Sequence, residues 1–420
     1  MKVKDYTSIG ERVFHEKLLN GLPVYVVSKP GYSKGRAFFA VNYGGADRRF
    51  KANGKWLNTP AGIAHYLEHK MFDMEDGNAL GVLFANGASA NAFTSSDMTA
   101  YHFECTENFE QNLRTLLKFV STPYFTEESV EKERGIIGQE IRMTEDSPET
   151  AGYFGLLKLM YKKHPMRDSI VGTVDDIAQI TPQMLYDCHG TFYTNTNMVL
   201  CVVGDVDPDM VARAAEEILP KARGEAPIKD YGRDDAPSGK KRSVKAQMAV
   251  GMPLLFAGAR LEKVPNERIL QQEVTAQAAL RLLIGRTSPL YMDLYSRGLI
   301  GRDFLGQYDR IAGQAMLIFS GESRDPEAVA EAISERAESI LNEDFSEAFE
   351  RQKKALIGAR LRELNSFSDV CYNVAKGCFD GYDPFEAISA LQGVTAKSVR
   401  DLISESLSPE KLMVSAVVPK

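Results

Sequence analysis

The pattern of hydrophobic and polar positions predicts amphipathic helices mixed with short strands. Apolar runs at 24–27 and 37–41 have strand length and precede the first long helical pattern. Strands and helices do not alternate regularly along the chain. An α+β fold, a largely antiparallel sheet packed on helices, is therefore favoured over a doubly wound parallel sheet. The pattern leaves the order of the strands open.

The apolar pattern is interrupted once, between 223 and 245. This stretch is polar, contains Pro and Gly, and has no apolar period. A chain of 420 residues fits two cores of about 200 residues each. We therefore predict domains at 1–222 and 246–420, joined by a linker at 223–245. The basic run Lys240-Lys241-Arg242 is interpreted as solvated linker and not as a binding patch.

The two predicted domains are similar to each other in sequence. Thr181 and Thr395 each precede an apolar run, at Val199 and at Met413, by the same 18 residues. These two threonines are 214 residues apart (395−181), whereas the helical segments around 137 and 357 align at an offset of 220. A shift of six residues reconciles the two offsets. The pattern indicates a duplication, and hence two homologous αβ-roll domains.

Composition excludes several classes of function. Lys and Arg number 50 against 57 Asp and Glu, a net charge of −7, so nothing indicates binding to nucleic acid or to an anionic membrane. No apolar run approaches the ~20 residues of a membrane span, and the N-terminus lacks the apolar core of a signal peptide. Five scattered cysteines fit buried thiols in a reducing compartment. We expect a cytoplasmic protein.

The segment His65-Tyr66-Leu67-Glu68-His69 carries the chemistry. Thr59-Pro60 suits a helix start, so we predict a helix from there through Phe72. On a helix, residues three and four apart share a face, and His65, Glu68 and His69 can project into one site. The two imidazoles can chelate one Zn²⁺ while the carboxylate holds a water; this is the inverzincin pattern. The alternative is a surface helix with incidental histidines.

A catalytic zinc site needs a third protein ligand. The best candidates are Glu133 and Glu140, seven residues apart on a predicted helix and therefore on one face. One can bind the metal while the other supports the site. Taken alone, both are also ordinary solvated glutamates. Three further histidines lack metal-ligand spacing and are interpreted as structural: His102, His164 and His189.

With these residues the chain resembles the insulinase/pitrilysin family of zinc metallopeptidases, closest to its short processing peptidase-like members. The resemblance implies that His65, His69 and Glu140 hold one zinc ion and that Glu68 is the general base. It also assigns Glu133 to the catalytic site as a supporting glutamate. The stretch Phe192-Tyr193 through Val206 resembles the signature that closes the family's first domain.

The resemblance also implies where substrate binds. The strand Asn91, Ala92, Phe93 and Thr94, followed by Tyr101, resembles the strand that in this family pairs with the substrate backbone. Such an edge would hold an extended peptide by main-chain hydrogen bonds, with little demand on its sequence. The alternative for these residues is an ordinary turn and edge strand.

The second half departs from the family pattern. Active relatives usually present an Arg and a Tyr, seven residues apart, which clamp the substrate; Leu294 and Gly301 stand at those positions. Arg297, Arg302, Tyr308 or a partner subunit could take their place. In this departure the chain resembles a bacterial subgroup that is linked to modification of a translation elongation factor. Members of that subgroup occur beside a homologue without the motif.

Together these features predict a zinc-dependent endopeptidase that cleaves extended peptides in a clamshell chamber. One chain resembles half of that clamshell, so a homodimer or a heterodimer with a homologous subunit is implied. The alternative function is a non-catalytic or assembly subunit of a peptidase-like complex.

Overall fold

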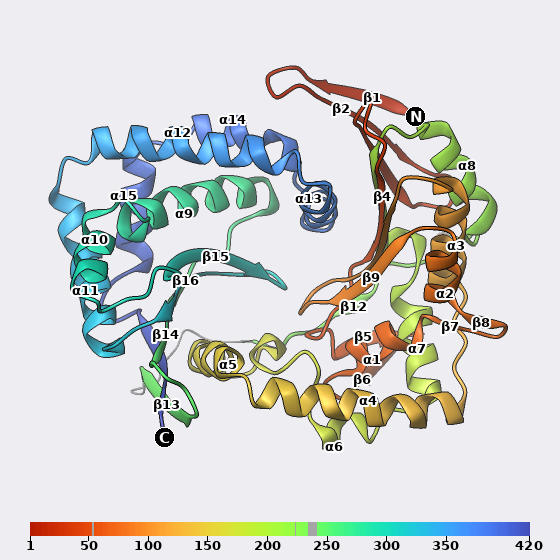
Figure 1. Ribbon diagram of the computed structural model, residues 1–420, viewed down its shortest axis with the longest axis horizontal. Helices are drawn as coiled ribbons and strands as arrows, with labels where there is room; N and C mark the ends of the chain where they lie inside the picture. The colour runs from red at the N-terminus through yellow and green to blue at the C-terminus, as the bar shows by residue number, and fades with distance from the viewer. Residues whose placement is uncertain (53, 223, 234–241) are drawn as a thin grey trace. The chain divides into compact units, whose positions relative to one another are not determined.

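The computed structural model describes residues 1–52, 54–222, 224–233 and 242–420 (Figure 1). These residues form two compact units. Unit 1 comprises Met1–Ile141, Asp168–Tyr231 and Leu361–Gly381, and unit 2 comprises Arg142–Arg167, Gly232–Arg360 and Tyr382–Lys420. Each unit is therefore built from segments of both halves of the chain.

Unit 1 contains a seven-stranded sheet in the order β1-β2-β3-β11-β4-β10-β9. All neighbouring pairs are antiparallel except β3 and β11. The strands are β1 (Lys2–Tyr6), β2 (Glu11–Lys17), β3 (Pro23–Ser28), β4 (Gly35–Val41), β9 (Ser89–Thr94), β10 (Thr99–Cys105) and β11 (Met198–Gly204).

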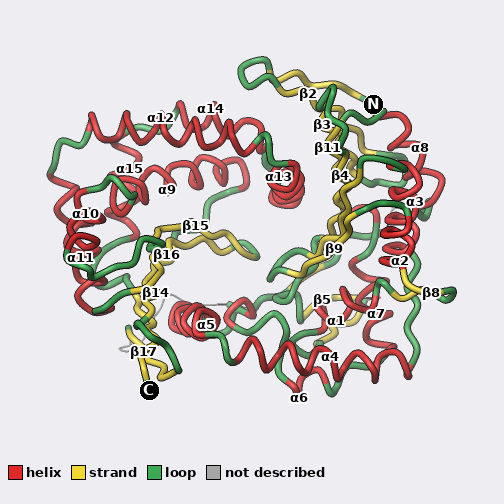
Figure 2. The backbone as a smooth tube through the Cα atoms, viewed as in Figure 1, coloured by secondary structure: helices red, strands yellow, loops and turns green. Residues whose placement is uncertain are grey.

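Helices cover both faces of this sheet, as Figures 1 and 2 show. Helices α3 (Phe109–Ser121) and α8 (Pro208–Ile218) pack on one face. Helix α13 (Phe367–Asp380), which comes from the second half of the chain, packs on the other, against β4 and β11. Every residue of β4 and β11 is buried because both faces of these strands are covered.

The remaining elements of unit 1 surround the sheet. A three-stranded sheet has the order β12-β5-β6, and β7 pairs with β8. The elements are β5 (Arg49–Ala52), β6 (Lys55–Asn58), β7 (Asp73–Met74), β8 (Gly77–Asn78), β12 (Ile228–Lys229), α1 (Ile63–Lys70), α2 (Ala79–Ala85), α6 (Val174–Ile177), α7 (Pro182–Phe192) and η2 (Asn195–Asn197).

Unit 2 repeats this plan around a five-stranded sheet in the order β13-β17-β14-β16-β15. Its strands are β13 (Ser243–Met248), β14 (Leu254–Arg260), β15 (Leu305–Ile311), β16 (Gln314–Glu322) and β17 (Met413–Pro419). Its helices are α5 (Pro148–Met160), η1 (Pro165–Arg167), η3 (Asn266–Arg268), α9 (Ile269–Ile284), α10 (Pro289–Ser296), α11 (Pro326–Ser339), η4 (Ile340–Asn342), η5 (Pro384–Glu386), α14 (Ala387–Gln392) and α15 (Ala396–Ser406).

The two sheets have the same topology. The order β3-β11-β4-β10-β9 in unit 1 corresponds to β13-β17-β14-β16-β15 in unit 2. In both, the first two strands are parallel and the others antiparallel. The expected α+β fold of two homologous domains with largely antiparallel sheets is confirmed. The hairpin of β1 and β2 is an addition to the first copy.

Each half of the chain contributes one helix that packs on the sheet formed by the other half. Helix α5, from the first half of the chain, packs on β13, β14 and β17 of unit 2, while α13 packs on unit 1. The long helices α4 (Glu127–Glu145) and α12 (Ser346–Glu363) precede these two and contain the points where the chain passes between units. The duplicated pattern therefore folds with reciprocal exchange of one helix.

Part of the predicted linker at 223–245 forms strands. Ile228–Lys229 pairs with β5 in unit 1, and β13 begins at Ser243. The buried carboxylate of Asp47 holds the strand Ile228–Lys229 in place. It accepts hydrogen bonds from Lys229 Nζ at 2.9 Å and from the Tyr231 hydroxyl at 2.7 Å. Within the basic run, Lys240 and Lys241 lie outside the described residues.

The cysteines behave as expected from their scatter. Cys105, Cys188, Cys201 and Cys371 are buried and Cys378 is partly buried, and all five are free thiols. Among the described residues, no helix combines the length and the apolar character that a membrane span requires.

Candidate metal centre

Helix α1 begins later than the sequence predicts. It starts at Ile63 because Gly62 adopts φ +88°, a left-handed conformation that favours glycine. A Cβ on Gly62 would also lie 2.6 Å from the Val171 carbonyl oxygen. Thr59 does not cap the helix; its hydroxyl donates to the Arg48 carbonyl at 3.2 Å. The predicted start at Thr59-Pro60 and end at Phe72 are therefore wrong, although the motif lies inside the helix.

The two faces of α1 have different surroundings. Ile63, Tyr66 and Leu67 are buried in the hydrophobic core of unit 1. The Tyr66 hydroxyl donates to the Val130 carbonyl, which ties α1 to α4. His65 and His69 keep 14% and 21% of their side chains exposed. The core thus fixes the rotation of the helix and leaves the imidazoles directed at α4.

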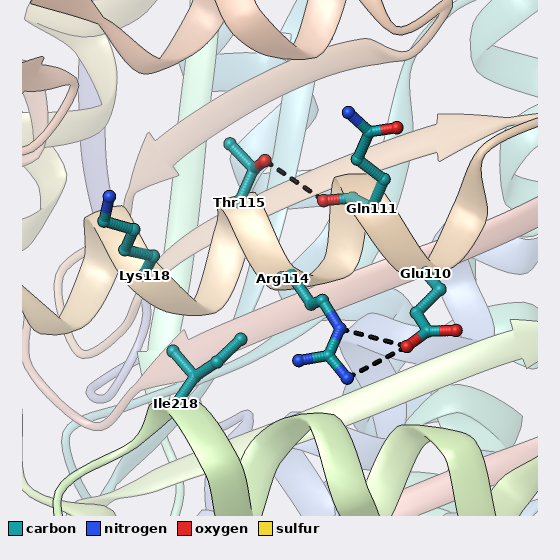
Figure 3. A pocket seen from close by; sticks show the side chains of 6 residues that line it. All are labelled: Glu110, Gln111, Arg114, Thr115, Lys118 and Ile218. Atoms are coloured by element: carbon teal, nitrogen blue, oxygen red, sulfur yellow. Dashed lines mark hydrogen bonds and ion pairs between the residues drawn. The ribbon is translucent and has the colours of Figure 1, made fainter.

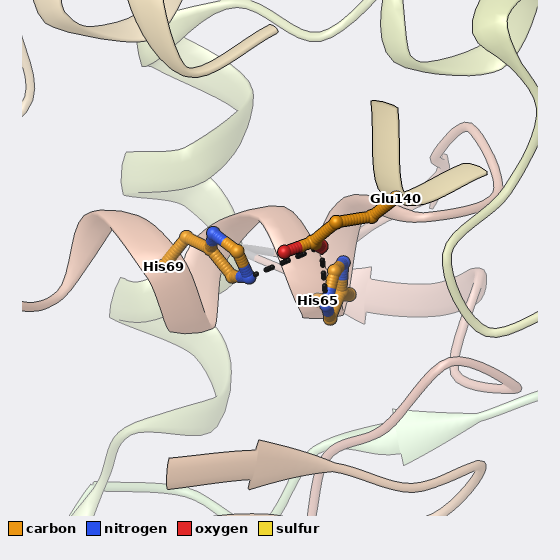
Figure 4. A group of neighbouring side chains, drawn as sticks. All are labelled: His65, His69 and Glu140. Carbon is orange, nitrogen blue, oxygen red and sulfur yellow. Dashed lines mark ion pairs between the residues drawn. The ribbon is translucent and has the colours of Figure 1, made fainter. Parts of the chain in front are cut away.

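The two imidazoles meet Glu140 of α4 (Figure 4). Glu140 Oε2 lies 3.6 Å from His65 Nε2 and 3.6 Å from His69 Nε2. The three ligand atoms all lie within 4.8 Å of one another. Figure 4 shows the three side chains pointing toward a common point, with both histidines on one helix and the glutamate arriving from another.

This donor set fits zinc. Ligand atoms about 2.0–2.1 Å from a tetrahedral ion lie about 3.3 Å apart, close to the separations between Glu140 and the imidazoles. Two imidazole nitrogens and one carboxylate oxygen are the donors of a catalytic zinc site with one open position. Burial lowers the pKa of His65 to about 4, with the neighbouring His69 adding to the shift, and this favours the neutral imidazole that a metal requires.

Glu133, two helical turns before Glu140, orients His69. Its Oε1 lies 2.9 Å from His69 Nδ1. This hydrogen bond holds the pKa of Glu133 below its usual value. Although burial acts the other way, the bond and the nearby carboxylates raise the pKa of His69. With the proton on Nδ1, His69 donates to Glu133 and presents a free lone pair on Nε2.

Glu68 lies beside the cluster and is itself buried, with 7% exposure. Burial raises the pKa of its carboxyl group. The Thr94 hydroxyl donates to Glu68 Oε2 at 2.8 Å. A buried carboxylate with a raised pKa is suited to accept a proton.

Strand β9 forms one edge of the unit 1 sheet, next to α1. It carries the predicted substrate-binding residues Asn91, Ala92, Phe93 and Thr94, of which Asn91 is exposed and the others are partly buried. Its pairing with β10 uses one side of the strand only. Among the described residues, no strand pairs with its other side.

Tyr101 does not lie at this surface. The residue is fully buried on β10, and its hydroxyl lies 2.8 Å from that of Tyr193, which is also buried. The expectation that Tyr101 contacts substrate is therefore corrected: its side chain points into the core, where it packs against Phe72 and Phe119.

The residues at the positions of the family's Arg and Tyr, and their possible replacements, all lie in unit 2. Leu294 is buried in α10, and Arg297 at the end of that helix pairs with Asp293 at 3.0 Å. Arg302 is 83% exposed, and Tyr308 lies on β15. A role for any of these residues at the active site stays a prediction.

The surface of unit 1 also has a hollow of about 510 Å³ at α3 and Ile218 (Figure 3). Two of its charged residues pair, since Arg114 contacts Glu110 at 2.9 Å, and Arg114 also contacts Glu217 at 2.8 Å. None of the residues of the metal cluster lines it. The hollow is not part of the candidate site.

The sequence matches two family profiles. "Insulinase (Peptidase family M16)" matches residues 57–174, which include the whole metal cluster, and "Peptidase M16 inactive domain" matches residues 179–356. The uncharacterized zinc protease YmfH of Bacillus subtilis (strain 168) is 38% identical over 100% of both chains. The chain therefore belongs to the insulinase family, the M16 peptidases.

Solved structures agree with this assignment. An M16-like peptidase from Alicyclobacillus acidocaldarius is 32% identical and superimposes with a TM-score of 0.92, covering 98% of this chain and 99% of that one. A chain of complex III2 from Candida albicans, in an Inz-5-bound structure, is 13% identical with a TM-score of 0.78, covering 96% of this chain and 95% of that one. The second likeness is one of fold alone.

Proposed function

We propose that this protein is a zinc-dependent endopeptidase. The observation that carries the proposal is the convergence of His65 Nε2, His69 Nε2 and Glu140 Oε2, beside a buried carboxylate, Glu68. Relatives that carry the name zinc protease support the choice of metal. His65, His69 and Glu140 would hold one zinc ion per chain, and Glu133 would fix the orientation of His69.

Zinc bound at such a site would polarise the substrate carbonyl and lower the pKa of a water molecule to ~7. The protein supplies the base. Glu68 takes the proton from the attacking water and passes it to the leaving amine. Thr94 holds Oε2 of this carboxylate, which leaves Oε1 to receive the proton.

The substrate would lie along β9. An extended peptide that adds to this edge as a further strand binds by main-chain hydrogen bonds, so its position is set with little dependence on sequence. Asn91, Ala92, Phe93 and Thr94 would contact it. Unfolded or extended peptides are therefore the proposed substrate class.

The substitution Glu68→Gln tests the assignment of the base. It should leave zinc content unchanged, because Glu68 is not a ligand, and reduce peptide hydrolysis by at least ~10²-fold, the lower end of what general base catalysis contributes. Glu140→Gln should instead release zinc. Zinc is measured by elemental analysis and turnover with a quenched fluorescent peptide. Glu131→Gln, on an exposed residue of α4, serves as the control.

A Glu68→Gln protein that still hydrolyses peptide at the wild-type rate would refute the mechanism. If Glu140→Gln, or a double substitution of His65 and His69 by Ala, retained stoichiometric zinc, the metal would be bound at another site.

We also propose that the active form is a homodimer or a heterodimer with a homologous subunit, in the cytoplasm. Free, largely buried cysteines support a reducing compartment. Leu294 and Gly301, at the positions where the family usually has its Arg and Tyr clamp, support a contribution from a second chain. Native mass spectrometry of the active protein should find the dimer; a monomer with full turnover contradicts it.

The same two residues favour the alternative, a non-catalytic or assembly subunit. The two functions differ in a simple assay. Stoichiometric zinc with turnover, alone or after addition of a homologous chain, supports the peptidase. Zinc without turnover under both conditions supports the assembly role.

A further inference from the structure

Glu68 is connected to the second half of the chain through a short series of contacts. Thr94, which donates to Glu68, is the last residue of β9. The turn that follows it, from Ser95 to Met98, leads directly into β10. The position of the Thr94 hydroxyl therefore depends on the conformation of this turn.

The turn is closed by its own polar groups. Ser95 N donates to the Met98 carbonyl at 2.7 Å, and Met98 N donates to Ser95 Oγ at 3.0 Å. The Ser95 hydroxyl lies 3.2 Å from Asp97 Oδ1. Gly44 packs so closely that a Cβ there would lie 2.5 Å from the Ser95 carbonyl oxygen. The backbone at Gly44 therefore confines the turn from outside, and the Asp97 side chain bonds within it.

Asp97 is bound by a lysine from α13. Lys376 Nζ donates to Asp97 Oδ2 at 2.8 Å, and Asp380 lies 3.7 Å from the same Nζ. The side chains of Lys376 and Asp97 are only 12% and 15% exposed. An ion pair this little exposed to water is screened weakly, so loss of one partner should be felt at the turn.

A second contact joins α13 to the same strand. The ring of Tyr372, one turn before Lys376, lies 6.3 Å from the ring of Phe93, the residue before Thr94. α13 also packs on β4 and β11, so it is held by the sheet itself. The helix is therefore a fixed support from which Lys376 can hold the turn.

We propose that Thr94 and Lys376 are positioning residues for Glu68, and that the second half of the chain takes part in catalysis through α13. The proposal rests on the proposed function, because it assumes that Glu68 is the base. Thr94 orients the carboxylate directly. Lys376 acts through Asp97 and the turn, without contact with substrate or metal.

Thr94→Val removes the hydroxyl and keeps the shape of the side chain. In the zinc-loaded protein it should lower kcat by about tenfold or more while KM stays within about twofold, because the hydroxyl orients the base, whereas the proposed contact with substrate is through the main chain. Thr94→Ser keeps the hydroxyl and should restore most of kcat. Thr115→Val, at the hollow of Figure 3, is the matched control and should behave as wild type.

Lys376→Met should lower kcat in the same direction, and Lys376→Arg should restore part of it. The double variant of Thr94→Val and Lys376→Met should lose no more than Thr94→Val alone, because both act along one path. Independent, multiplying losses would overturn the connection. Lys397→Met, which removes an exposed lysine paired with Asp401, controls for loss of a charge.

Hydrogen exchange tests the same connection without any activity. Lys376→Met should raise the amide exchange of Ser95 and Met98 about tenfold, while zinc content and the exchange of α3 stay unchanged. Unchanged exchange of the turn would overturn the role of Lys376. If Glu68→Gln stays active, the proposed function fails; if Glu68→Gln is inactive but Thr94→Val keeps wild-type kcat, only the present inference fails.

Discussion

The two imidazoles of the metal centre are held differently. His69 Nδ1 bonds to Glu133, whereas His65 Nδ1 is buried and has no hydrogen-bond partner among the described residues. His65 is positioned by its place on α1 and by burial, while His69 also depends on a carboxylate behind it. This difference makes the contribution of Glu133 measurable.

Replacement of Glu133 by Ala should weaken zinc binding about 10- to 100-fold, the usual cost of losing the partner that orients a metal-bound histidine. Glu133→Gln retains an acceptor for Nδ1 and should cost less. Competition with a chromophoric chelator measures the affinity. Glu131→Ala, on an exposed position of the same helix, is the control and should bind zinc as wild type does. Equal affinity for both alanine variants would show that Glu133 does not support the site.

At the scale of residues, the sequence predicted which side chains meet better than what each one does. The spacing of His65, Glu68 and His69 on one helix places them together whatever the rest of the fold is. The helical pattern offers Glu133 and Glu140 as the third ligand, and the family resemblance favours Glu140. The bond from Thr94 to Glu68 and the pair of Lys376 and Asp97 join distant parts of the chain, so no local pattern reveals them. The substrate contact expected of Tyr101 is wrong because the family resemblance identifies a segment and does not say which of its side chains are buried.

At the scale of elements, packing of α5 on the unit 2 sheet requires glycine. A Cβ on Gly152 would overlap the ring of Phe256 on β14, and one on Gly155 would lie 2.5 Å from Ser415 Oγ on β17. Gly135 of α4, in contrast, is exposed and has open space where a Cβ would be. Close packing on the sheet therefore requires glycine at 152 and 155, whereas no such contact requires it at 135.

Gly152→Ala should destabilise unit 2 by about 1–3 kcal/mol, because the added methyl group must displace a buried aromatic ring. Gly135→Ala is the matched control, and it should stabilise the protein by about 0.5–1 kcal/mol because alanine favours the helix. Differential scanning calorimetry of both variants measures the change in Tm. A rise in Tm for Gly152→Ala would mean that α5 does not approach β14 this closely.

Strand and helix types were predictable where a segment carries its own signal. The runs at 24–27 and 37–41 are β3 and β4. The two threonines of the repeat, at 181 and 395, cap the equivalent helices α7 and α15. The start of α1 was not predictable from Thr59-Pro60, because the left-handed turn at Gly62 is imposed by the close approach of Val171. Strand order needed the structure, since pairing joins segments far apart in the chain.

At the scale of the whole molecule, the exchange of α5 and α13 makes the compact units differ from the two repeats of the sequence. The predicted division at 1–222 and 246–420 follows the repeat in the sequence, and that division stays a prediction about homology. The compact units instead combine segments of both halves. The apolar pattern does not distinguish these arrangements, because a helix has the same buried face whichever copy of the sheet it covers.

The exchange predicts that the halves cannot fold alone. A fragment of residues 1–231 contains the metal motif but lacks α13, so it would expose the face of β4 and β11 that carries Phe38 and Cys201, both now buried. It would also carry α5 without β14 and β17. We expect this fragment to aggregate, and to form a soluble complex that retains zinc only when residues 243–420 are co-expressed.

Solubility, calorimetry and zinc content of the fragment, alone and with its complement, measure this dependence. The control is the full chain with a protease site inserted between 233 and 242 and cut after folding; its two pieces should stay together on a sizing column. If the fragment 1–231 alone showed a cooperative thermal transition and bound zinc, α13 would not be needed to complete unit 1.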